Sequence, residues 1–325
     1  MLHASIDKDF YRELCDQHSS LVPLFHQAWW LQAVCGEDWQ AIICQDGERT
    51  AGVWPLHMRR KYGLRCALMP QLTPYGGPLY FPPDGLSSAR LPDFENKVVQ
   101  AMMPCIDSLR LHLSILKLSP AISNWLPFYW QGFQQTTRYT YRIADIRNPE
   151  QVLNNFDRSK QRARTIRQAE PHYQLVDNLT ATQFATMHHR YWQSQGEADL
   201  LSLDLIERVV ESATARHQGL LLGLRNAEGQ VVVAWFVVYD SRCAYALLSA
   251  RSEAHTARDK DATALLIWKF LQRLAPLTQV FDFEGSMEPG AEYYYRSFGA
   301  VQTPVMQLTR CSNALLRAAL TFRRT

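Results

Sequence analysis

Hydrophobic residues recur along the chain at every second position in short segments and at every third or fourth position in longer ones. The first spacing predicts β-strands, and the second predicts amphipathic α-helices. Ser5 stands where a helix-capping residue is expected, and the Asp46-Gly47 pair predicts the turn of a β-hairpin. The first half predicts, in order, helices 5–17 and 23–35, strands 39–44 and 52–58, helix 92–109, strand 113–118, helix 123–130 and strand 134–146.

The second half repeats this order of elements. Helices lead to a hairpin around Glu228-Gly229, followed by a long helix, a strand, a short aromatic helix, a Phe-Gly pair and a last strand. Such repetition indicates a duplicated domain. The expected fold is therefore α/β (mixed α+β), with domains 1–147 and 148–325 that each have a mixed, mostly antiparallel sheet flanked by helices. The second half predicts helices 149–169, 181–195 and 203–217, strands 220–224, 231–239 and 243–249, helix 261–274, a strand from 280, helix 291–298, strand 301–308 and a basic helix over 312–325.

Composition supports two globular domains and excludes several classes of protein. The 325 residues are 47% hydrophobic and 20% charged, and the net charge of +3 is too small to indicate wholesale nucleic-acid binding. The longest apolar run, 231–239, is shorter than the ~20 residues that cross a bilayer, and the N-terminus lacks the pattern of a signal peptide. The 7 cysteines have no Cys-x-x-Cys spacing, so we expect reduced thiols, a cytoplasmic protein and no metal site.

The segment 281–300 has the strongest chemical character. Asp282 and Glu284 alternate with phenylalanines in a predicted strand, Gly285 ends the strand, and a short helix follows with three consecutive tyrosines. Two residues apart on a strand, the carboxylates are expected on the same face. The alternative is a helix that packs Tyr293 and Tyr294 on a sheet.

This segment resembles the C-terminal end of a GNAT acyltransferase domain. Its residues Asp-Phe-Glu-Gly-Ser-Met and Tyr-Tyr-Arg-Ser-Phe-Gly-Ala are similar to the FemABX-like branch of that superfamily. That branch has two GNAT domains in one chain and includes the aminoacyltransferases that build peptidoglycan cross-bridges. Because the order of elements repeats, the resemblance covers nearly the whole chain and implies tandem GNAT-like domains.

A second conspicuous segment is the loop Leu-Thr-Pro-Tyr-Gly-Gly-Pro over 72–78. Its prolines and glycines predict a constrained turn, and glycine lets a backbone approach a ligand closely. The loop resembles the Pro-x-Tyr-Gly-Gly-Pro loop that FemABX-like proteins carry near the acceptor substrate. The resemblance therefore implies that Tyr75, Gly76 and Gly77 bind substrate, and the alternative is a simple tight turn.

A third segment is basic. Arg158, Lys160, Arg162, Arg164 and Arg167 lie within ten residues with no acid among them. On one helix, like charges at this spacing repel each other, unless a phosphate-bearing ligand binds there. We expect an anion site that includes three of these arginines, and the alternative is a solvated helix face. The substrate-binding candidates here are Arg158, Arg162 and Arg167.

The resemblance implies transfer of an acyl or aminoacyl group to an amine. Such a reaction needs a base for the amine and a donor for the oxyanion. Asp282 and Glu284 are the candidate bases, and the residues alone do not choose between them. Tyr295 and Arg296 are the candidate donors, since the family commonly has Phe-Lys where this chain has Tyr294-Tyr295. The loop 251–263 has no glycine, so the usual CoA phosphate cradle is missing.

The predicted function is thus a FemABX-like acyltransferase that forms an amide on an amine acceptor, with a peptidoglycan precursor as one candidate acceptor. It binds no cofactor tightly and uses aminoacyl-tRNA or acyl-CoA as co-substrate. The expected partners are a small-molecule or peptide-sugar acceptor and, for an aminoacyl donor, tRNA. The alternatives are an acyl-CoA or acyl-carrier-protein dependent N-acyltransferase on a small metabolite, and a non-catalytic binding protein on the GNAT fold.

Overall fold

A computed structural model describes residues 1–61, 63–158, 161–196, 201–253, 255–256, 259, 261–285, 287 and 289–312. The chain divides into two compact units. Unit 1 comprises Met1–Arg138 together with the strand that runs on from Pro304, and unit 2 comprises Tyr139–Thr303. Both changes of unit fall inside a strand, whereas the sequence placed the boundary after residue 147. The predicted pair of folding domains stays a prediction, and the predicted helix 312–325 lies outside the described residues except for Ser312.

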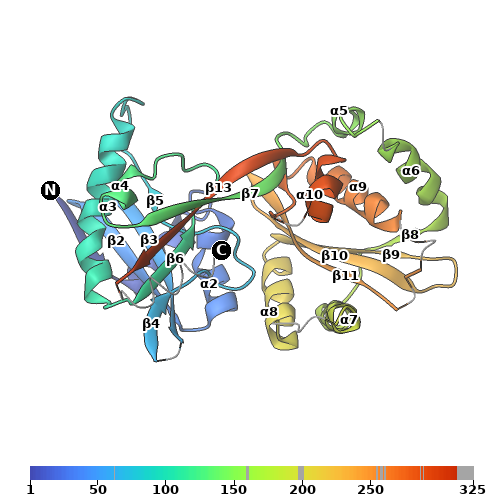
Figure 1. Cartoon of the computed structure of the whole chain (residues 1–325), viewed down its shortest axis with the longest axis horizontal. Coiled ribbons are helices and arrows are strands. Elements are labelled where there is room, and N and C mark those ends of the chain that lie inside the picture. The colour runs from blue at the N-terminus through green and yellow to red at the C-terminus, as the bar shows by residue number, and fades with distance from the viewer. Residues whose placement is uncertain are drawn as a thin grey trace. The chain divides into compact units, whose positions relative to one another are not determined.

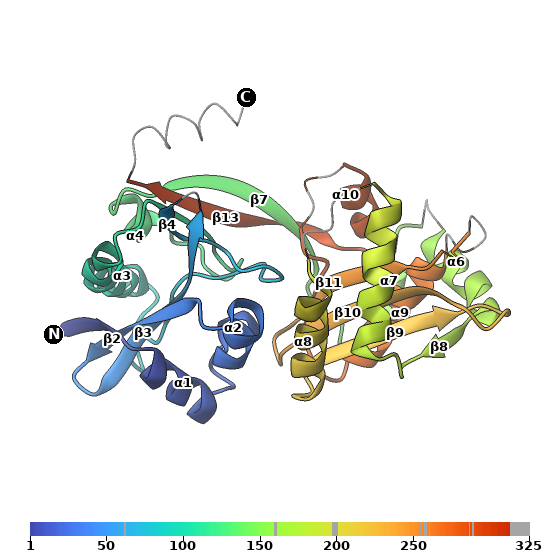
Figure 2. The ribbon, with the colours of Figure 1, turned by 90° about the horizontal axis from the view of Figure 1, so that it is seen from below.

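Unit 1 is a sheet covered by helices on both faces (Figure 2). Its strand order is β1-β2-β3-β4-β6-β13, with β5 paired to β3, and β4–β6 is a parallel pair in an otherwise antiparallel arrangement. Its elements are β1 (Leu2–Ile6), α1 (Lys8–Gln17), η1 (Leu24–His26), α2 (Ala28–Cys35), β2 (Trp39–Asp46), β3 (Arg49–Lys61), β4 (Leu64–Ala67), β5 (Leu79–Tyr80), α3 (Leu91–Ser108), β6 (Leu113–Lys117), α4 (Leu126–Tyr129), the start of β7 (Gln134–Ile143) and most of β13 (Val301–Cys311).

Strand β2 shows why the middle of a central strand is apolar at consecutive positions. Ile42 and Cys44 join the core under α3, while the intervening residues Ala41 and Ile43 join a second core under α1 and α2. Alternate side chains point to opposite faces, so a strand with helices on both sides is buried on both.

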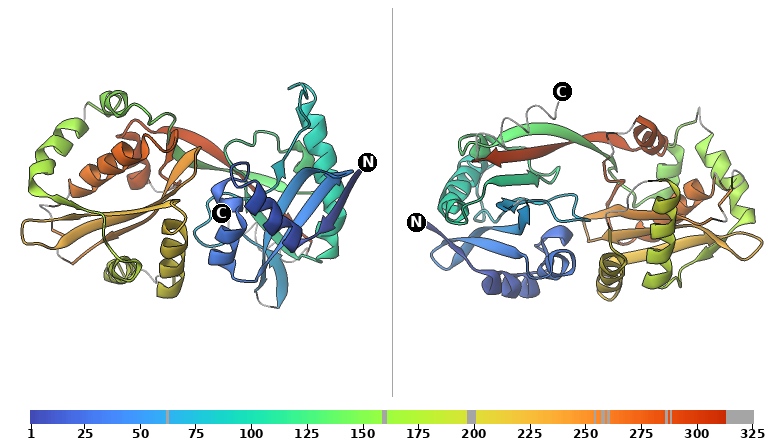
Figure 3. Two further views of the ribbon diagram at one scale, coloured as in Figure 1. Left: turned by 180° about the vertical axis from the view of Figure 1, so that it is seen from behind. Right: turned by 60° about the horizontal axis from the view of Figure 1, so that its bottom comes forward.

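Unit 2 has the strand order β7-β12-β11-β10-β9-β8, in which β11–β12 is the parallel pair. Helices α7 and α8 cover one face, and α6, α9 and α10 lie on the other (Figures 1 and 3). Its elements are the end of β7, α5 (Pro149–Asn154), α6 (Arg162–Ala169), η2 (Glu170–His172), β8 (Gln174–Val176), α7 (Ala181–Ser194), α8 (Leu203–Thr214), β9 (Gly219–Arg225), β10 (Val231–Tyr239), β11 (Cys243–Arg251), α9 (Ala262–Leu274), β12 (Val280–Asp282), α10 (Pro289–Arg296) and the start of β13.

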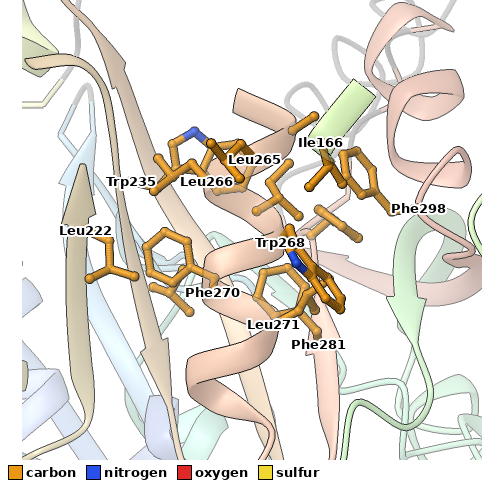
Figure 4. Close-up of a cluster of buried hydrophobic side chains, with 14 of the residues drawn as sticks. Ile166, Leu222, Trp235, Leu265, Leu266, Trp268, Phe270, Leu271, Phe281 and Phe298 are labelled. Carbon is orange, nitrogen blue, oxygen red and sulfur yellow. The ribbon is translucent and has the colours of Figure 1, made fainter. Parts of the chain in front are cut away.

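The core of unit 2 is built around α9. Leu266, Phe270 and Leu271 of this helix are fully buried, and they pack with Trp235 of β10 and Phe281 of β12 (Figure 4). This contact holds α9 against the sheet at β10 and β12.

The predicted mixed α/β class and both predicted hairpins are confirmed, and two helices are corrected. Residues 2–6 form a strand, and the first helix starts at Lys8 with Asp7 as its cap, which accepts from the Phe10 N–H at 2.9 Å. The predicted helix 149–169 is two helices, and α6 starts after Gln161, whose φ of 49° does not continue a helix. Among the described residues, none of the helices is both long and apolar enough to cross a membrane.

Candidate active site

The candidate active site of unit 2 lies where the parallel strands β11 and β12 separate. They pair over only three residues each, from Cys243 to Tyr245 and from Val280 to Asp282. A β-bulge then follows in β11, because Val237 pairs with Ala246 while the preceding residue of β10 pairs with Leu248. Bulges of this kind re-aim side chains beside active sites. Ligands of open sheets with parallel strands bind beyond the carboxyl ends of the strands, where such neighbours diverge.

Asp282, one of the two candidate bases, is fully buried at the end of β12. Its carboxylate accepts hydrogen bonds from the Thr140 hydroxyl and, at 2.9 Å, from the Glu284 N–H. The Arg142 Nε lies 3.4 Å from the other oxygen. These contacts join β12 to β7 and hold the backbone of Glu284.

Glu284, the other candidate base, lies beyond the end of β12 rather than on it. The expectation that both acids share one strand face is therefore wrong, because the strand ends at Asp282 and Phe283 bonds instead to the Tyr141 carbonyl at 2.9 Å. Glu284 has a φ of 53°, which is rare for a residue with a side chain. Residues held in such conformations cluster at functional sites.

Gly285 explains how the chain turns at this point. A Cβ atom on Gly285 would lie 1.8 Å from the Tyr139 carbonyl oxygen and 3.1 Å from the Thr140 Cα. Only glycine lets the backbone pass this close to β7. The sequence indicated a strand break here, and the structure adds that the break is set by backbone contact.

Tyr295 lies on α10, near enough to Glu284 for the carboxylate charge to act on its phenol. Its ring stacks on Phe283 with centroids 4.8 Å apart and packs at 6.2 Å from the ring of Tyr141. Burial raises the pKa of the Tyr295 phenol, and the nearby charge of Glu284 raises it further. The hydroxyl is therefore protonated at neutral pH and able to donate a hydrogen bond. The structure thus brings together Glu284 and Tyr295.

Arg162 belongs to the same neighbourhood, but the structure gives it protein partners. Its Nη2 and Nε donate to the Ser297 hydroxyl at 2.8 and 3.1 Å, and its guanidinium lies 4.9 Å from the ring centroids of both Tyr294 and Phe298. Burial raises the pKa of Tyr294 to about 12, against the opposing charges of Arg162 and Arg251. The Tyr294 hydroxyl is buried and has no hydrogen-bond partner among the residues that the structure describes. Nothing local in the sequence signals that Arg251 lies near Tyr294, because the two residues stand on different elements.

Three other candidates lie on the surface. Arg158 is exposed in the turn before α6, and Arg167 is exposed near the end of that helix. Arg158 and Arg162 therefore do not stack on one helix as the sequence suggested. Arg296 is half exposed and forms an ion pair with Glu292 one turn earlier, where its Nη2 lies 3.1 Å from a carboxylate oxygen.

The loop of unit 1 with Tyr75, Gly76 and Gly77 borders a small pocket. Gly77 has a φ of 96°, and a Cβ on it would lie 2.6 Å from a methyl of Leu118. The glycines therefore let the loop pack closely on β6 and its continuation, where the Gly76 N–H donates to the Lys117 carbonyl at 2.7 Å. The Tyr75 side chain is buried in the wall of the pocket.

Comparison with known proteins finds one matching domain family and several solved structures with the same fold. Residues 150–296 match the family model described as "Acetyltransferase (GNAT) domain". The chain is similar over 98% of its length to 99% of the crystal structure of FemX, with a TM-score of 0.73 and 11% identity. It is similar over 96% of its length to 99% of a tandem GNAT protein from the clavulanic acid biosynthesis pathway, with a TM-score of 0.54 and 10% identity.

A third similar structure is L-PGS from Bacillus licheniformis, with a TM-score of 0.53, 11% identity and coverage of 84% of this chain and 85% of that one. No curated protein sequence matches the chain. At these identities the structural likeness shows a shared fold. The family match in addition identifies a GNAT domain over residues 150–296. The likeness to FemX over nearly the full length shows that the chain shares the fold of that structure, as the resemblance seen in the sequence predicted.

Proposed function

We propose that the chain forms an amide by transferring an acyl or aminoacyl group to an amine, at the point where β11 and β12 separate. The observation that carries this proposal is the placement of Glu284, just beyond the end of β12, beside the protonated phenol of Tyr295. Acyl transfer to an amine requires a proton acceptor and a hydrogen-bond donor for the oxyanion at one point, and this pair offers both.

In the proposed reaction, the amine nitrogen attacks the acyl carbonyl carbon while the Glu284 carboxylate accepts a proton from the amine. Tyr295 donates a hydrogen bond to the oxyanion that forms. As the new C–N bond is completed, the bond from the acyl carbon to the leaving group breaks, and the leaving group departs with the proton. Asp282 takes no proton in this scheme, because its contacts to Thr140 and Arg142 hold it as a buried carboxylate. Arg296 would have to leave Glu292 to take part, so we assign it no role.

The start of α9 bears on the acyl donor. Asp259 is buried, and its carboxylate accepts from the Thr256 N–H and hydroxyl, both at 2.8 Å, and from the Tyr173 hydroxyl at 2.7 Å. With Asp261, it places two carboxylates just before the first turn of α9. GNAT domains commonly hold a CoA pyrophosphate at this helix N-terminus, and the negative charge of the two carboxylates would repel it. This arrangement favours an aminoacyl donor over acyl-CoA.

The donor is tested first by ligand binding. Acyl-CoAs and charged tRNAs are added separately to the full chain, and the melting temperature is measured, since a ligand that binds only the folded state raises it. We expect stabilisation by charged tRNA and none by acyl-CoA. The opposite result would reverse the donor assignment and leave the amide-forming reaction standing. Amine acceptors, including peptide-sugar precursors and small metabolites, are then assayed with the donor that binds.

The catalytic roles are tested with matched variants. We expect Tyr295→Phe to lower turnover about 10²- to 10³-fold, with a smaller change in acceptor affinity, because the hydroxyl acts in the transition state. Glu284→Gln is expected to lower it about 10²- to 10⁴-fold. Tyr293→Phe is the control, since Tyr293 lies on the same helix and is 47% exposed. If Tyr295→Phe and Glu284→Gln turn over as fast as this control, the site assignment is wrong.

A further inference from the structure

The backbone of Glu284 has a conformation that its surroundings must impose. Its φ of 53° lies in the left-handed region, which residues with a side chain rarely adopt. Such a conformation persists only where neighbouring groups over-determine it. The contacts of Phe283 and Gly285 with β7 hold the residues on either side, whereas the Glu284 N–H is held by a side chain. That side chain therefore helps to set where the Glu284 carboxylate lies.

Asp282 supplies the side chain that holds this N–H group. Its Oδ1 accepts from the Glu284 N–H at 2.9 Å. A carboxylate that bonds to the N–H two residues later shapes the chain into a turn. Asp282 is fully buried, so bulk water does not compete for this oxygen. The turn after β12 therefore depends on the orientation of one carboxylate.

Thr140 fixes the orientation of that carboxylate. Its hydroxyl donates to the same Oδ1 atom, and the residue is 1% exposed. Asp282 pairs with Arg142 of β7, and Thr140 lies two residues before Arg142, so its side chain is on the same face of the sheet as Asp282. A carboxylate turns readily about its last bond, whereas the β-branched threonine side chain is stiff. The Thr140 hydroxyl therefore limits the rotation of the carboxylate.

Arg142 favours the charged form of Asp282. Its Nε lies 3.4 Å from Oδ2 of Asp282, and its Nη2 donates to the Sγ of Cys243 in β11 at 3.5 Å. A positive charge beside a buried carboxylate stabilises the ionised form. Asp282 therefore remains an acceptor for both Thr140 and Glu284.

We propose that Thr140 and Asp282 are positioning residues of the acyl transfer, which act through one shared oxygen atom to hold the backbone of Glu284. The inference rests on the proposed function, because it takes Glu284 as the proton acceptor. In this scheme neither Thr140 nor Asp282 exchanges a proton with the substrate. The alternative is that their contact only joins β7 to β12, and the two roles differ in what happens at Glu284.

The first test needs no substrate and follows hydrogen exchange at the Glu284 amide, by NMR of the full chain with isotope-labelled glutamate. Thr140→Val removes the hydroxyl and keeps the shape of the side chain. We expect the Glu284 amide to exchange about ten- to a hundredfold faster than in the parent, the effect of one lost hydrogen bond to a charged group. Thr278→Val is the matched control, because Thr278 is 4% exposed and its hydroxyl has no hydrogen-bond partner among the described residues. Equal exchange at Glu284 in the two variants would overturn the proposal.

Thr140→Ser separates the hydroxyl from the packing of the side chain. It keeps the hydroxyl and loses the methyl group, so exchange at Glu284 and turnover should both stay close to those of the parent. If Thr140→Ser clearly changes either rate, packing rather than the hydroxyl is responsible and the proposal is wrong, whether or not Thr140→Val folds.

Turnover then connects the contact to the reaction. Amide formation from charged tRNA, or from acyl-CoA if only that donor binds, is measured with a peptide-sugar acceptor below the melting temperature of each variant. Thr140→Val should lower kcat about ten- to a hundredfold and leave the KM of the acceptor within about twofold, because a misplaced base slows the reaction after binding. In a Glu284→Gln background it should cause no further loss, since a positioning residue acts only through the group that it positions. An equal loss in both backgrounds would refute the proposal.

Failure of this inference and failure of the proposed function give different results. If Glu284→Gln turns over as fast as the Tyr293→Phe control, the proposed function loses its base. If Glu284→Gln is impaired while Thr140→Val turns over as fast as Thr278→Val, only the positioning role of Thr140 is wrong.

Discussion

Replacement of Gly285 by alanine tests the backbone contact on which the candidate active site depends. The added Cβ would lie 1.8 Å from the Tyr139 carbonyl oxygen and 2.8 Å from its carbon. Real Cβ contacts shorter than 3.0 Å essentially never occur, so the two backbones must separate by about 1.2 Å. A flexible side chain could move away by this distance at little energetic cost, but the opposing atoms are backbone atoms of β7. That strand is held to the segment by the Phe283 N–H to Tyr141 carbonyl bond at 2.9 Å.

We therefore expect a cost at the upper end of the usual range for overpacking, about 3 kcal/mol. For a unit of this size, that loss corresponds to a fall in melting temperature of roughly 6–12 °C. The displacement also moves the neighbouring Glu284, so the acyl-transfer rate should fall with the stability. Thermal unfolding followed by circular dichroism measures the first effect, and a turnover assay measures the second.

Gly290→Ala is the matched control. A Cβ on Gly290 meets no atom within 4 Å, and the residue lies in the first turn of α10, where alanine is favoured by about 0.5–1 kcal/mol. This variant should melt at or slightly above the temperature of the parent. If Gly285→Ala melts within about 2 °C of the control, β7 yields without cost and the reasoning is refuted.

Three further predictions concern strain, an arginine and pH. The φ of 53° at Glu284 costs about 1–2 kcal/mol for a residue with a Cβ. In denaturant unfolding, Glu284→Gly should therefore be more stable than Glu284→Ala by about 1 kcal/mol. Equal stability of the two variants would show that the backbone is not strained at this position. Arg162→Ala should lower the free energy of unfolding by about 1–2 kcal/mol, because Arg162 bonds to Ser297. Arg167 is exposed, so Arg167→Ala should change the free energy of unfolding by no more than about 0.5 kcal/mol. A larger loss for Arg167→Ala than for Arg162→Ala would contradict these contacts. The pKa of His26 is about 4 in the fold against 6.5 ordinarily, so as the pH falls below 6.5 the unfolded chain gains a proton that the folded chain refuses. The free energy of unfolding therefore falls towards pH 4, by up to about 3 kcal/mol, and His26→Gln should remove this part of the pH dependence. If the free energy of unfolding falls with pH in parallel for the parent and His26→Gln, His26 is not the cause.

Much of the architecture could be predicted from local sequence pattern. The hairpins around Asp46-Gly47 and Glu228-Gly229, the helix 262–274 and the strand–break–helix segment near residue 285 all follow from periodicity and turn residues. These signals are local, because the groups that produce them lie within a few residues of each other. The same limitation explains the error at residues 149–169, where helical periodicity continues across a break that the turn at Gln161 imposes.

The assignment of roles within the candidate site needed the tertiary structure. Asp282 and Glu284 are two residues apart and chemically alike, and what separates their roles is the pairing of β12 with β7, from a segment about 140 residues earlier in the chain. That pairing buries Asp282 against Thr140, forces Gly285 against Tyr139 and leaves Glu284 beside Tyr295.

The pocket of His26 and His57 has the same origin. Neither histidine stands in a recognisable motif, and the two residues line one pocket only because η1, β3 and the loop 72–78 converge in unit 1. The sequence by itself determined the elements and the family resemblance, since both are written in spacings along the chain. Burial, charge and hydrogen-bond partners depend on contacts between distant segments, so only the tertiary structure distinguished Asp282 from Glu284 and Arg162 from Arg158.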